Sequence, residues 1–185
     1  MNLSKLSDEE LAQATIDGDK SAFQSLVERY QRPLFSYLYR FLYQNHDAAE
    51  DVLQSVFIKF YQNLKAVDLE KKVKPWIYRI AHNEAANYLR SKSRRKEVML
   101  DSPIWDIIPN GSSGKEQTEN ENREIIQWAL AQLKPKYREV LVLHYYEEKS
   151  YGEISQIIDS SVNSVGTLLR RARQQMEKLL AHTRD

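Results

Sequence analysis

Apolar residues recur every three or four positions along almost the whole chain, and few glycines or prolines interrupt them. A clear example is the series Leu26, Tyr30, Leu34, Tyr37 and Phe41, which falls on one side of a helix. This period is that of an amphipathic α-helix, whereas a half-buried strand would alternate at every second residue. The 185 residues include only five glycines and five prolines. The sequence therefore predicts an all-α protein.

One segment breaks this pattern and divides the chain into two blocks. Residues 99–122 concentrate proline, glycine, serine, asparagine and acidic residues around a short apolar island at 104–108. Such a composition is typical of a linker. The blocks on either side, residues 1–98 and 123–185, are both within the size range of helical modules that fold alone. We therefore expect two small helical domains joined by an acidic linker.

Local signals place four helices in the first block. Ser7 and Glu10 have the spacing of a capping box, which opens a first short helix. Two further helices are expected over residues 21–43 and 47–64, where the apolar period continues. A last helix begins near Pro75, since proline is favoured in the first turn of a helix. The first block is thus predicted to be a four-helix module.

The second block is predicted to contain a helix-turn-helix motif. Helices are expected over residues 124–133 and 136–146, and a second capping box, Ser150 with Glu153, opens a short third helix. After a tight turn, Ser161 is a suitable N-cap for a longer fourth helix. A short helix, a tight turn and a longer helix form the order found in DNA-binding helix-turn-helix motifs.

The last helix of the second block has two different sides. A helical wheel places an apolar set on one side: Val165, Leu169, Ala172, Met176 and Leu179. The opposite side carries donor-rich side chains that suit base edges and phosphates: Asn163, Thr167, Arg170 and Gln174, flanked by Ser164, Arg171 and Lys178. Gly166, between the two sides, costs about 1 kcal/mol of helix propensity and would permit close approach of a DNA backbone. From spacing alone, the polar side of this helix is as consistent with an ordinary solvated surface as with a DNA-binding one.

Charge is segregated along the chain although the formal net charge is only +1. Residues 71–96 contain nine lysines and arginines against one acid, Glu84, whereas residues 101–124 contain six acids against two basic residues. Such asymmetry is typical of a protein with localised electrostatic surfaces. The basic segment coincides with the last helix of the first block and is a candidate surface for nucleic acid.

Several classes of protein are not expected from the composition. There is no cysteine, and the four histidines show no ligand spacing, so we expect no metal and no cofactor. No Ser-His-Asp order, carboxylate cluster or phosphate-binding glycine loop indicates an enzyme. The N-terminus lacks the apolar region of a signal peptide, and no apolar run approaches the roughly 20 residues needed to cross a bilayer. We expect a cytoplasmic protein without membrane insertion.

Both blocks resemble modules of one family. In the second block, LKPKYREVLVLHYYEEKSYGEI and its continuation SQIIDSSVNSVGTLLRRARQQMEKL are similar to region 4 of bacterial sigma factors. In the first, SAFQSLVERYQRPLFSYLYRFL, DAAEDVLQSVFIKFYQNL and VKPWIYRIAHNEAANYLRSKSRR resemble successive parts of region 2. Two such modules joined by a short linker resemble the extracytoplasmic-function (ECF) class of the sigma-70 family. The resemblance implies a promoter-specificity subunit of RNA polymerase.

The resemblance also implies where region 2 would act. An acidic helix would bind the clamp coiled coil of the largest polymerase subunit, through Asp47, Glu50, Asp51, Gln54 and Phe57. An ordinary helix surface with acids near its N-terminus is the alternative. The basic helix and the loop before it would open the minus-ten promoter element, which requires cations for phosphates and flat or amide side chains for unstacked bases. The matching residues are Lys71, Lys72, Lys74, Trp76, Arg79, His82, Asn83, Asn87, Arg90, Arg94 and Arg95.

Region 4 would bind the minus-thirty-five element as duplex DNA and contact the flap of the second-largest subunit. The matching DNA-binding residues are Ser161, Asn163, Ser164, Thr167, Arg170, Arg171 and Gln174. Gly166 and Leu168 stand where relatives often have basic residues, so we expect weak binding that depends on polymerase. Asp159 replaces the usual turn glycine, which is tolerable because aspartate enters the left-handed region more easily than most residues. An anti-sigma partner is a further implication of the resemblance.

Two other functions remain open from the sequence. A stand-alone helix-turn-helix regulator could use the first block for dimerisation or sensing, but it leaves the basic helix unexplained. A protein-binding helical adaptor leaves both basic surfaces without a role. Whether the two modules pack together in the absence of polymerase is not decided by the sequence.

Overall fold

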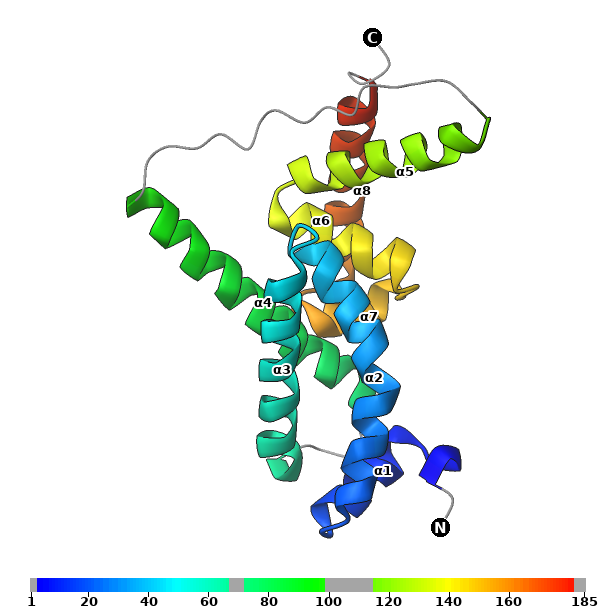
Figure 1. The fold of residues 1–185 in the computed structure, drawn as a ribbon, viewed down its shortest axis with the longest axis vertical. Helices are drawn as coiled ribbons and strands as arrows, with labels where there is room; N and C mark the ends of the chain where they lie inside the picture. The colour runs from blue at the N-terminus through cyan, green and yellow to red at the C-terminus, as the bar shows by residue number, and fades with distance from the viewer. Residues whose placement is uncertain (1–2, 67–71, 99–114, 182–185) are drawn as a thin grey trace.

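The computed structural model describes residues 3–66, 72–98 and 115–181, and only the backbone of residues 94–98 and 115–121. Every regular element in these ranges is helical, as predicted (Figure 1). The elements are η1 (Leu3–Lys5), α1 (Asp8–Ile16), α2 (Lys20–Phe41), α3 (His46–Asn63), η2 (Leu64–Ala66), α4 (Val73–Val98), α5 (Lys115–Gln132), α6 (Pro135–Leu141), η3 (Val142–Tyr146), α7 (Tyr151–Ile157) and α8 (Val162–Ala181).

The N-terminal module consists of α1 to α4. Helix α2 packs against α1 on one side and α3 on the other, and α3 packs against α4. The apolar period predicted these contacts, because Leu26, Leu34, Leu38 and, from α3, Val56 and Phe60 are fully buried between the helices. The predicted helices over residues 21–43 and 47–64 are found as α2 and α3, each within two residues of the expected ends.

Short-range signals define where these helices begin. The capping box at Ser7 is formed: Glu10 N donates to Ser7 Oγ at 3.1 Å, and Ser7 N donates to Glu10 Oε2 at 2.7 Å. Asn45 caps α3 with its side chain, accepting from Ala48 N at 2.9 Å. The chain turns sharply before α3, where Tyr43 and Gln44 both adopt positive φ angles.

The C-terminal module consists of α5, α6, η3, α7 and α8. Helices α5, α6 and α7 all contact α8, whose buried residues Val165, Leu169 and Ala172 come from the predicted apolar side. Between α7 and α8, Asp159 adopts φ 53°, the left-handed conformation expected of the turn. Ser161 Oγ accepts from Ser164 N at 3.1 Å and so caps α8 as predicted. The helix-turn-helix motif is therefore present.

Two helices of this module differ from the sequence prediction. Helix α5 begins at Lys115 rather than near residue 124, because the stretch from 115 to 123 contains three glutamates, which favour a helix, and no glycine or proline. The helix expected over residues 136–146 is α-helical only to Leu141 and continues as the π-helical turn η3. The π-helical turn widens the backbone where the chain leaves α6.

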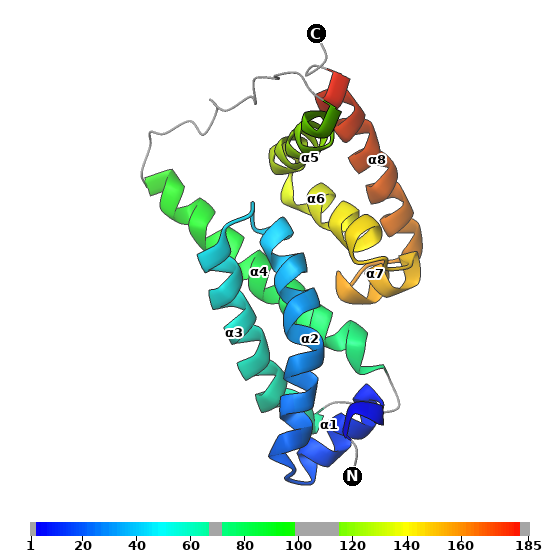
Figure 2. The ribbon, with the colours of Figure 1, turned by 45° about the vertical axis from the view of Figure 1, so that its right-hand side comes forward.

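The two modules pack directly against each other. Helix α7 contacts α4, while α6 and η3 contact α2 (Figure 2). The buried residues of both modules form one continuous core. The question left open by the sequence is thus answered in favour of a packed arrangement. No helix in the described part of the chain is long and apolar enough to span a membrane.

Candidate nucleic-acid and polymerase interfaces

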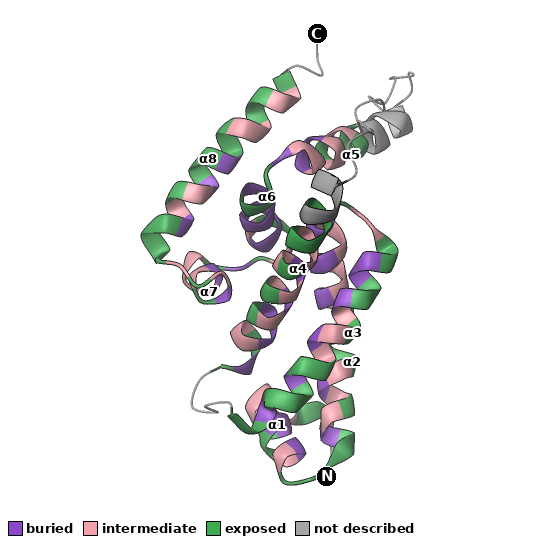
Figure 3. Cartoon of the chain, turned by 90° about the vertical axis from the view of Figure 1, so that its left-hand side faces the viewer, coloured by how far each residue is buried: buried purple, intermediate pink, exposed green. Residues whose placement is uncertain are grey.

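The basic helix α4 presents an exposed polar stripe. Arg79, Asn83, Asn87 and Arg90 are all exposed and follow one another at spacings of three or four residues, so they project from one side of the helix. Figure 3 shows exposed residues recurring along both α4 and α8. The Arg90 guanidinium donates to Asn87 Oδ1 at 2.8 Å, which joins two members of the stripe. This surface combines cations for phosphates with amides for bases.

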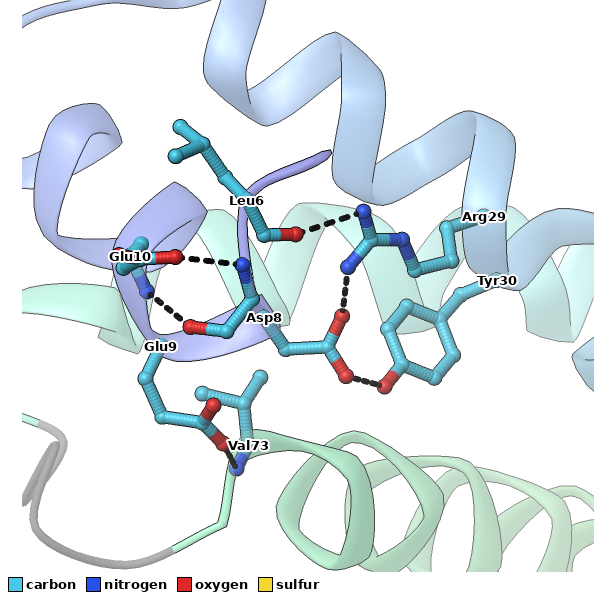
Figure 4. Close-up of polar contacts among 8 residues, drawn as sticks. Leu6, Asp8, Glu9, Glu10, Arg29, Tyr30 and Val73 are labelled. Atoms are coloured by element: carbon cyan, nitrogen blue, oxygen red, sulfur yellow. Dashed lines mark hydrogen bonds and ion pairs between the residues drawn. The ribbon is translucent and has the colours of Figure 1, made fainter. Parts of the chain in front are cut away.

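Helix α1 fixes the start of α4 by polar contacts (Figure 4). Glu9 Oε1 accepts from the backbone N of Val73 at 3.0 Å, satisfying one of the free N–H groups at the N-terminus of α4. Asp8 forms an ion pair with Arg29 of α2 at 2.5 Å and accepts from the Tyr30 hydroxyl. Burial and the hydrogen bond to Asp8 raise the pKa of Tyr30. The first turn of α1 therefore forms polar contacts with both α2 and α4.

A groove beside the stripe is lined partly by residues of α3, which the sequence did not predict to be part of this site. Its volume is about 370 Å³, and Lys59 and Asn63 of α3 face Trp76 and Asn83 of α4 across it. Lys59 Nζ also pairs with Glu84 Oε1 at 2.6 Å. Trp76 is half-buried, and its ring lies 4.9 Å from that of Phe60, so this member of the predicted minus-ten set packs against the core.

Acidic residues near the N-terminus of α3 border a partly apolar groove between α2 and α3. Asp47, Glu50, Asp51 and Gln54 are exposed, while Phe57 is half-buried. The groove has a volume of about 410 Å³ and is lined by Val27, Gln31, Glu50, Asp51, Leu53, Gln54 and Phe57. The α2 residues Val27 and Gln31 and the α3 residue Leu53 were not among the predicted site residues, since sequence spacing does not show which side of α2 meets α3. An acidic rim around apolar side chains suits a basic, amphipathic helical partner.

Helix α8 carries the predicted DNA-binding set on its outer surface. All seven residues are exposed: Ser161, Asn163, Ser164, Thr167, Arg170, Arg171 and Gln174. Ser161 and Ser164 contact each other through their hydroxyls at 2.8 Å, and Thr167 Oγ1 donates to the Asn163 carbonyl at 3.1 Å. Gly166 lies against the ring of Tyr151, which a Cβ atom would meet at 3.6 Å, an ordinary contact distance. The glycine is therefore not required by packing within the module.

The module boundary contains a buried polar cluster centred on α6. Arg138 is 1% exposed, and its guanidinium donates to the carbonyls of Leu130, Ala131 and Leu133 and, in the other module, to that of Phe41 at 2.9 Å. It also stacks on the Tyr43 ring with its carbon 3.4 Å from the centroid. Arg138 thus satisfies C-terminal carbonyls of both α5 and α2.

The next residue, Glu139, also contacts the other module, but with a negative charge where Arg138 has a positive one. Its Oε1 accepts from the Tyr37 hydroxyl at 2.6 Å and lies 2.5 Å from His82 Nδ1. The Glu139 side chain is only 6% exposed, and that of His82 is 21% exposed. Burial, together with the charge of Glu139, raises the pKa of Tyr37 well above its usual value.

A second group of contacts lies around Tyr78 of α4. Its hydroxyl donates to Glu147 Oε2 at 2.9 Å, and Lys149 Nζ lies 4.3 Å from its ring centroid. Burial raises the pKa of Tyr78 and of Glu147 and lowers that of Lys149. At the edge of the boundary, Arg79 pairs with Asp159 of the helix-turn-helix turn at 2.7 Å.

The predicted minus-ten residues are therefore distributed over two environments. Lys72, Lys74, Asn83, Asn87 and Arg90 are exposed. Arg79 and His82 contact the C-terminal module. Lys71 lies outside the described residues, and Arg94 and Arg95 belong to the part of α4 whose backbone alone is described. No cluster of three or more His, Cys, Asp or Glu residues suited to a metal ion occurs among the described residues.

Comparison with known proteins identifies both modules. The Sigma-70 region 2 family model matches residues 26–95, and the Sigma-70 region 4 model matches residues 123–176. The ECF RNA polymerase sigma factor SigW of Bacillus subtilis is 32% identical over 173 residues, which cover 88% of this chain and 91% of that protein. The ECF RNA polymerase sigma-E factor of Escherichia coli K12 is 31% identical over 181 residues, which cover 94% of this chain and 94% of that protein.

Solved structures show the same fold. CnrH, in complex with the cytosolic domain of CnrY, matches with a TM-score of 0.68 and 24% identity over 95% of this chain and 97% of that chain. The sigma factor RpoE of Bartonella quintana, in complex with the anti-sigma factor NepR, matches with a TM-score of 0.67 and 21% identity over 86% and 96% of the two chains.

Both sigma-70 region models match this chain and the relatives are sigma factors, so the alternative of a stand-alone helix-turn-helix regulator is not favoured. The chain belongs to the ECF sigma factors of the sigma-70 family, which direct RNA polymerase to promoters.

Proposed function

We propose that the two modules divide promoter recognition between them. The N-terminal module, residues 1–98, binds core polymerase and opens the minus-ten element, and the C-terminal module, residues 123–185, binds the minus-thirty-five element as duplex. Residues 99–122 connect them, and the last part of this segment, from Lys115, is already helical as the start of α5. The observation that carries this proposal is the presence of two exposed cationic and polar helix surfaces, one on α4 and one on α8, in different modules.

At the minus-ten element, α4 acts on a separated strand. The guanidinium groups of Arg79 and Arg90 suit phosphates, and the amides of Asn83 and Asn87 suit the edges of unstacked bases. The adjoining groove between α3 and α4 adds Lys59 and Asn63 to this surface. Lys72 and Lys74 add positive charge at the start of the helix. Lys71, Arg94 and Arg95 belong to the proposed set by sequence alone.

At the minus-thirty-five element, α8 enters the major groove. Its outer surface presents Arg170, Arg171 and Gln174 beside the N-terminal residues Asn163 and Ser164. Arginine and amide side chains at such positions can contact base edges and phosphates. With only two arginines in the set, the isolated surface binds weakly, and most of the affinity comes from polymerase.

Polymerase binds the N-terminal module at the acidic rim of α3. Asp47, Glu50 and Asp51 attract a basic helix such as one strand of the clamp coiled coil, and Phe57 provides an apolar contact in the groove beneath. The flap of the second-largest subunit binds the C-terminal module. An apolar groove of about 300 Å³ supports this second contact, and its lining includes Ile126, Leu130, Leu141, Tyr145, Met176 and Leu180.

An anti-sigma factor is a further proposed partner. CnrH and RpoE of Bartonella quintana, whose fold this chain shares, were each solved with a second protein bound, described for RpoE as the anti-sigma factor NepR. A partner of this kind would keep the protein from polymerase until a stimulus releases it.

Site-specific photocrosslinking in a polymerase–promoter complex tests this division. A photoreactive amino acid replaces Asn87 in one variant and Gln174 in another, and Gln24, exposed on α2, serves as control. We expect crosslinks from position 87 to the non-template strand near minus ten, crosslinks from position 174 to duplex near minus thirty-five, and none from position 24. Crosslinks from both positions to the same element, or from neither, would refute the assignment.

A further inference from the structure

A pocket of about 710 Å³ lies where α1, α2 and α4 meet the loop that follows η3. Its lining includes Lys72 and Lys74 at the start of α4, and Glu148 and Lys149 in that loop. The proposed minus-ten set includes Lys72 and Lys74, but no surface described above uses the loop. A space of this size is large enough for a small molecule.

Lys149 reaches this pocket although it is only 5% exposed. Its ammonium nitrogen lies 4.3 Å from the centroid of the Tyr78 ring, which stabilises the positive charge but accepts no ordinary hydrogen bond. Within the described residues, no oxygen accepts a hydrogen bond from Lys149 Nζ and no carboxylate forms an ion pair with it. An ammonium group has three donors, and a lysine this deeply buried is rarely left without an acceptor.

Two more lysines add positive charge at the same place. Burial, and then the nearby charge of Lys74, lower the pKa of Lys149, so the two ammonium groups are close enough to repel each other. Lys72 lines the same pocket. Bringing like charges together is unfavourable, and an anion that accepts from all three ammonium groups would offset this repulsion.

The acidic residues of the pocket are mostly engaged with donors other than these lysines. Asp8 pairs with Arg29, and Glu9 accepts from the first backbone N–H of α4 (Figure 4). Glu147 accepts from a tyrosine hydroxyl, and burial raises its pKa, which disfavours its negative charge. Glu148 is exposed and is the remaining carboxylate among the lining residues. The three lysines are therefore available to a bound anion.

We propose that this pocket is a binding site for a small phosphate-bearing compound, whose phosphate group lies between Lys72, Lys74 and Lys149. A phosphate group has a charge of about −1.5 to −2 and three strong acceptor oxygens, so it can accept from three ammonium groups at once. The DNA backbone is a second source of the same chemistry. It is disfavoured here, because Lys149 is almost completely buried and the exposed Glu148 would repel the neighbouring phosphates of a strand. The site is additional to the two promoter surfaces and does not depend on their assignment.

Three substitutions in the full chain test the site. Lys149→Met removes the buried ammonium but keeps an unbranched side chain, and it relieves the repulsion with Lys74, so this variant should fold. Lys136→Met is the matched control, because Lys136 also lies beside a tyrosine ring in the same module but does not line the pocket. Glu148→Gln removes a negative charge from the pocket and should strengthen anion binding, which a misfolded variant would not do. Thermal unfolding without ligand shows whether each variant is folded.

Isothermal titration calorimetry with sodium pyrophosphate measures binding, at an ionic strength held constant because salt screens such charges. We expect the wild type to bind one pyrophosphate per chain with a dissociation constant below about 1 mM. Lys149→Met should weaken binding at least tenfold, and Glu148→Gln should strengthen it about twofold or more. Lys136→Met should bind within about twofold of the wild type.

A second titration separates the two sources of phosphate. Fluorescence anisotropy measures the affinity of the same proteins for a labelled single-stranded 20-mer of thymidine, to which a basic surface binds without sequence preference. Lys149→Met should change this affinity by no more than about twofold, because the buried ammonium does not meet a strand on the outer surface of α4.

Several outcomes would overturn the proposal. Absence of saturable pyrophosphate binding by the wild type, or equal affinities of the wild type and Lys149→Met, would show that the pocket is not a phosphate site. Unchanged or weaker binding by Glu148→Gln would show that the anion does not bind beside this carboxylate. A loss of affinity for the 20-mer as large as the loss for pyrophosphate would assign Lys149 to DNA instead. Each outcome is distinct from failure of the proposed function, which is measured with polymerase and a promoter.

Discussion

Glu139 of α6 and His82 of α4 lie 2.5 Å apart across the boundary between the modules, and the Tyr37 hydroxyl donates to the same glutamate oxygen. The side chain of the preceding residue, Arg138, has different partners and donates to carbonyls at the ends of α2 and α5. Two consecutive charged residues on a seven-residue helix therefore join both modules through buried polar contacts. Unpaired, each would be strongly unfavourable at this depth.

Arg138→Met should destabilise the full chain by about 3 kcal/mol or more, because it leaves several buried carbonyls without a donor. Arg138→Lys should also be destabilising, since one ammonium group cannot replace a planar guanidinium that donates in several directions. Urea unfolding measures both effects, with Arg123→Met at an exposed position as control. A loss below about 1 kcal/mol for Arg138→Met would contradict this role.

Local signals in the sequence predicted much of the fold. The capping boxes at Ser7 and Ser150 and the N-cap at Ser161 formed as expected, because each depends on residues only three positions apart. The apolar side of α8 was likewise predicted from its period. In contrast, Arg138 and Glu139 looked like ordinary polar residues of an amphipathic helix. Their partners in α2 and α4 are more than fifty residues away, and helical periodicity does not identify a distant partner.

The candidate site, too, was predicted only in part from the sequence. Residue types identified the stripe on α4 and the outer surface of α8, which the structure exposes. The groove beside the stripe includes Lys59 and Asn63 because α3 packs on α4 at a particular rotation. That rotation depends on how side chains such as Phe60 and Trp76 interlock, and a single sequence does not specify it.

Gly166→Ala should stabilise the protein by about 0.5 to 1 kcal/mol, because alanine has the higher helix propensity and its Cβ fits beside Tyr151. Gly18→Ala provides the contrast. A Cβ added at Gly18 would meet no atom within 4 Å, but the φ of +106° disfavours any residue with a side chain, so this variant should be less stable. Thermal unfolding compares the two, and equal effects of the same sign would contradict the geometry.

Stability should depend on pH through Glu153 at the start of α7. Hydrogen bonds from the backbone and hydroxyl of Ser150 lower the pKa of Glu153 below its usual value of 4.5. Since the folded-state pKa is depressed, the stabilisation is fully present above the unfolded-state pKa and is lost as the pH falls through the folded-state value. Glu153→Gln imitates the protonated form.

The Glu153→Gln variant should therefore be about 0.5 to 1 kcal/mol less stable than the wild type at pH 7, and the difference should be smaller at pH 3. Urea unfolding at the two pH values measures it. Glu177→Gln, at an exposed position late in α8, should show little difference at either pH. A Glu153 difference that is as large at pH 3 as at pH 7 would mean that the carboxylate charge is not its source.

Charge reversal on α3 should weaken binding to core polymerase. Asp47→Lys with Asp51→Lys replaces attraction by repulsion along the acidic N-terminal part of α3, and we expect at least a tenfold loss of affinity, equivalent to about 1.4 kcal/mol. A fluorescence titration of labelled protein with core polymerase measures the effect. Glu28→Lys with Glu124→Lys makes the same change in net charge at exposed sites outside both proposed polymerase-binding grooves and should bind normally.

Promoter-directed initiation by purified core polymerase tests the central claim most directly. Run-off transcription is measured with the wild type, with Arg90→Glu on the α4 stripe, with Arg170→Glu on α8, and with the double reversal at Asp47 and Asp51. We predict transcripts of defined length with the wild type and a loss of at least tenfold in each variant. Initiation that is unchanged when any of these three surfaces is reversed would contradict the account.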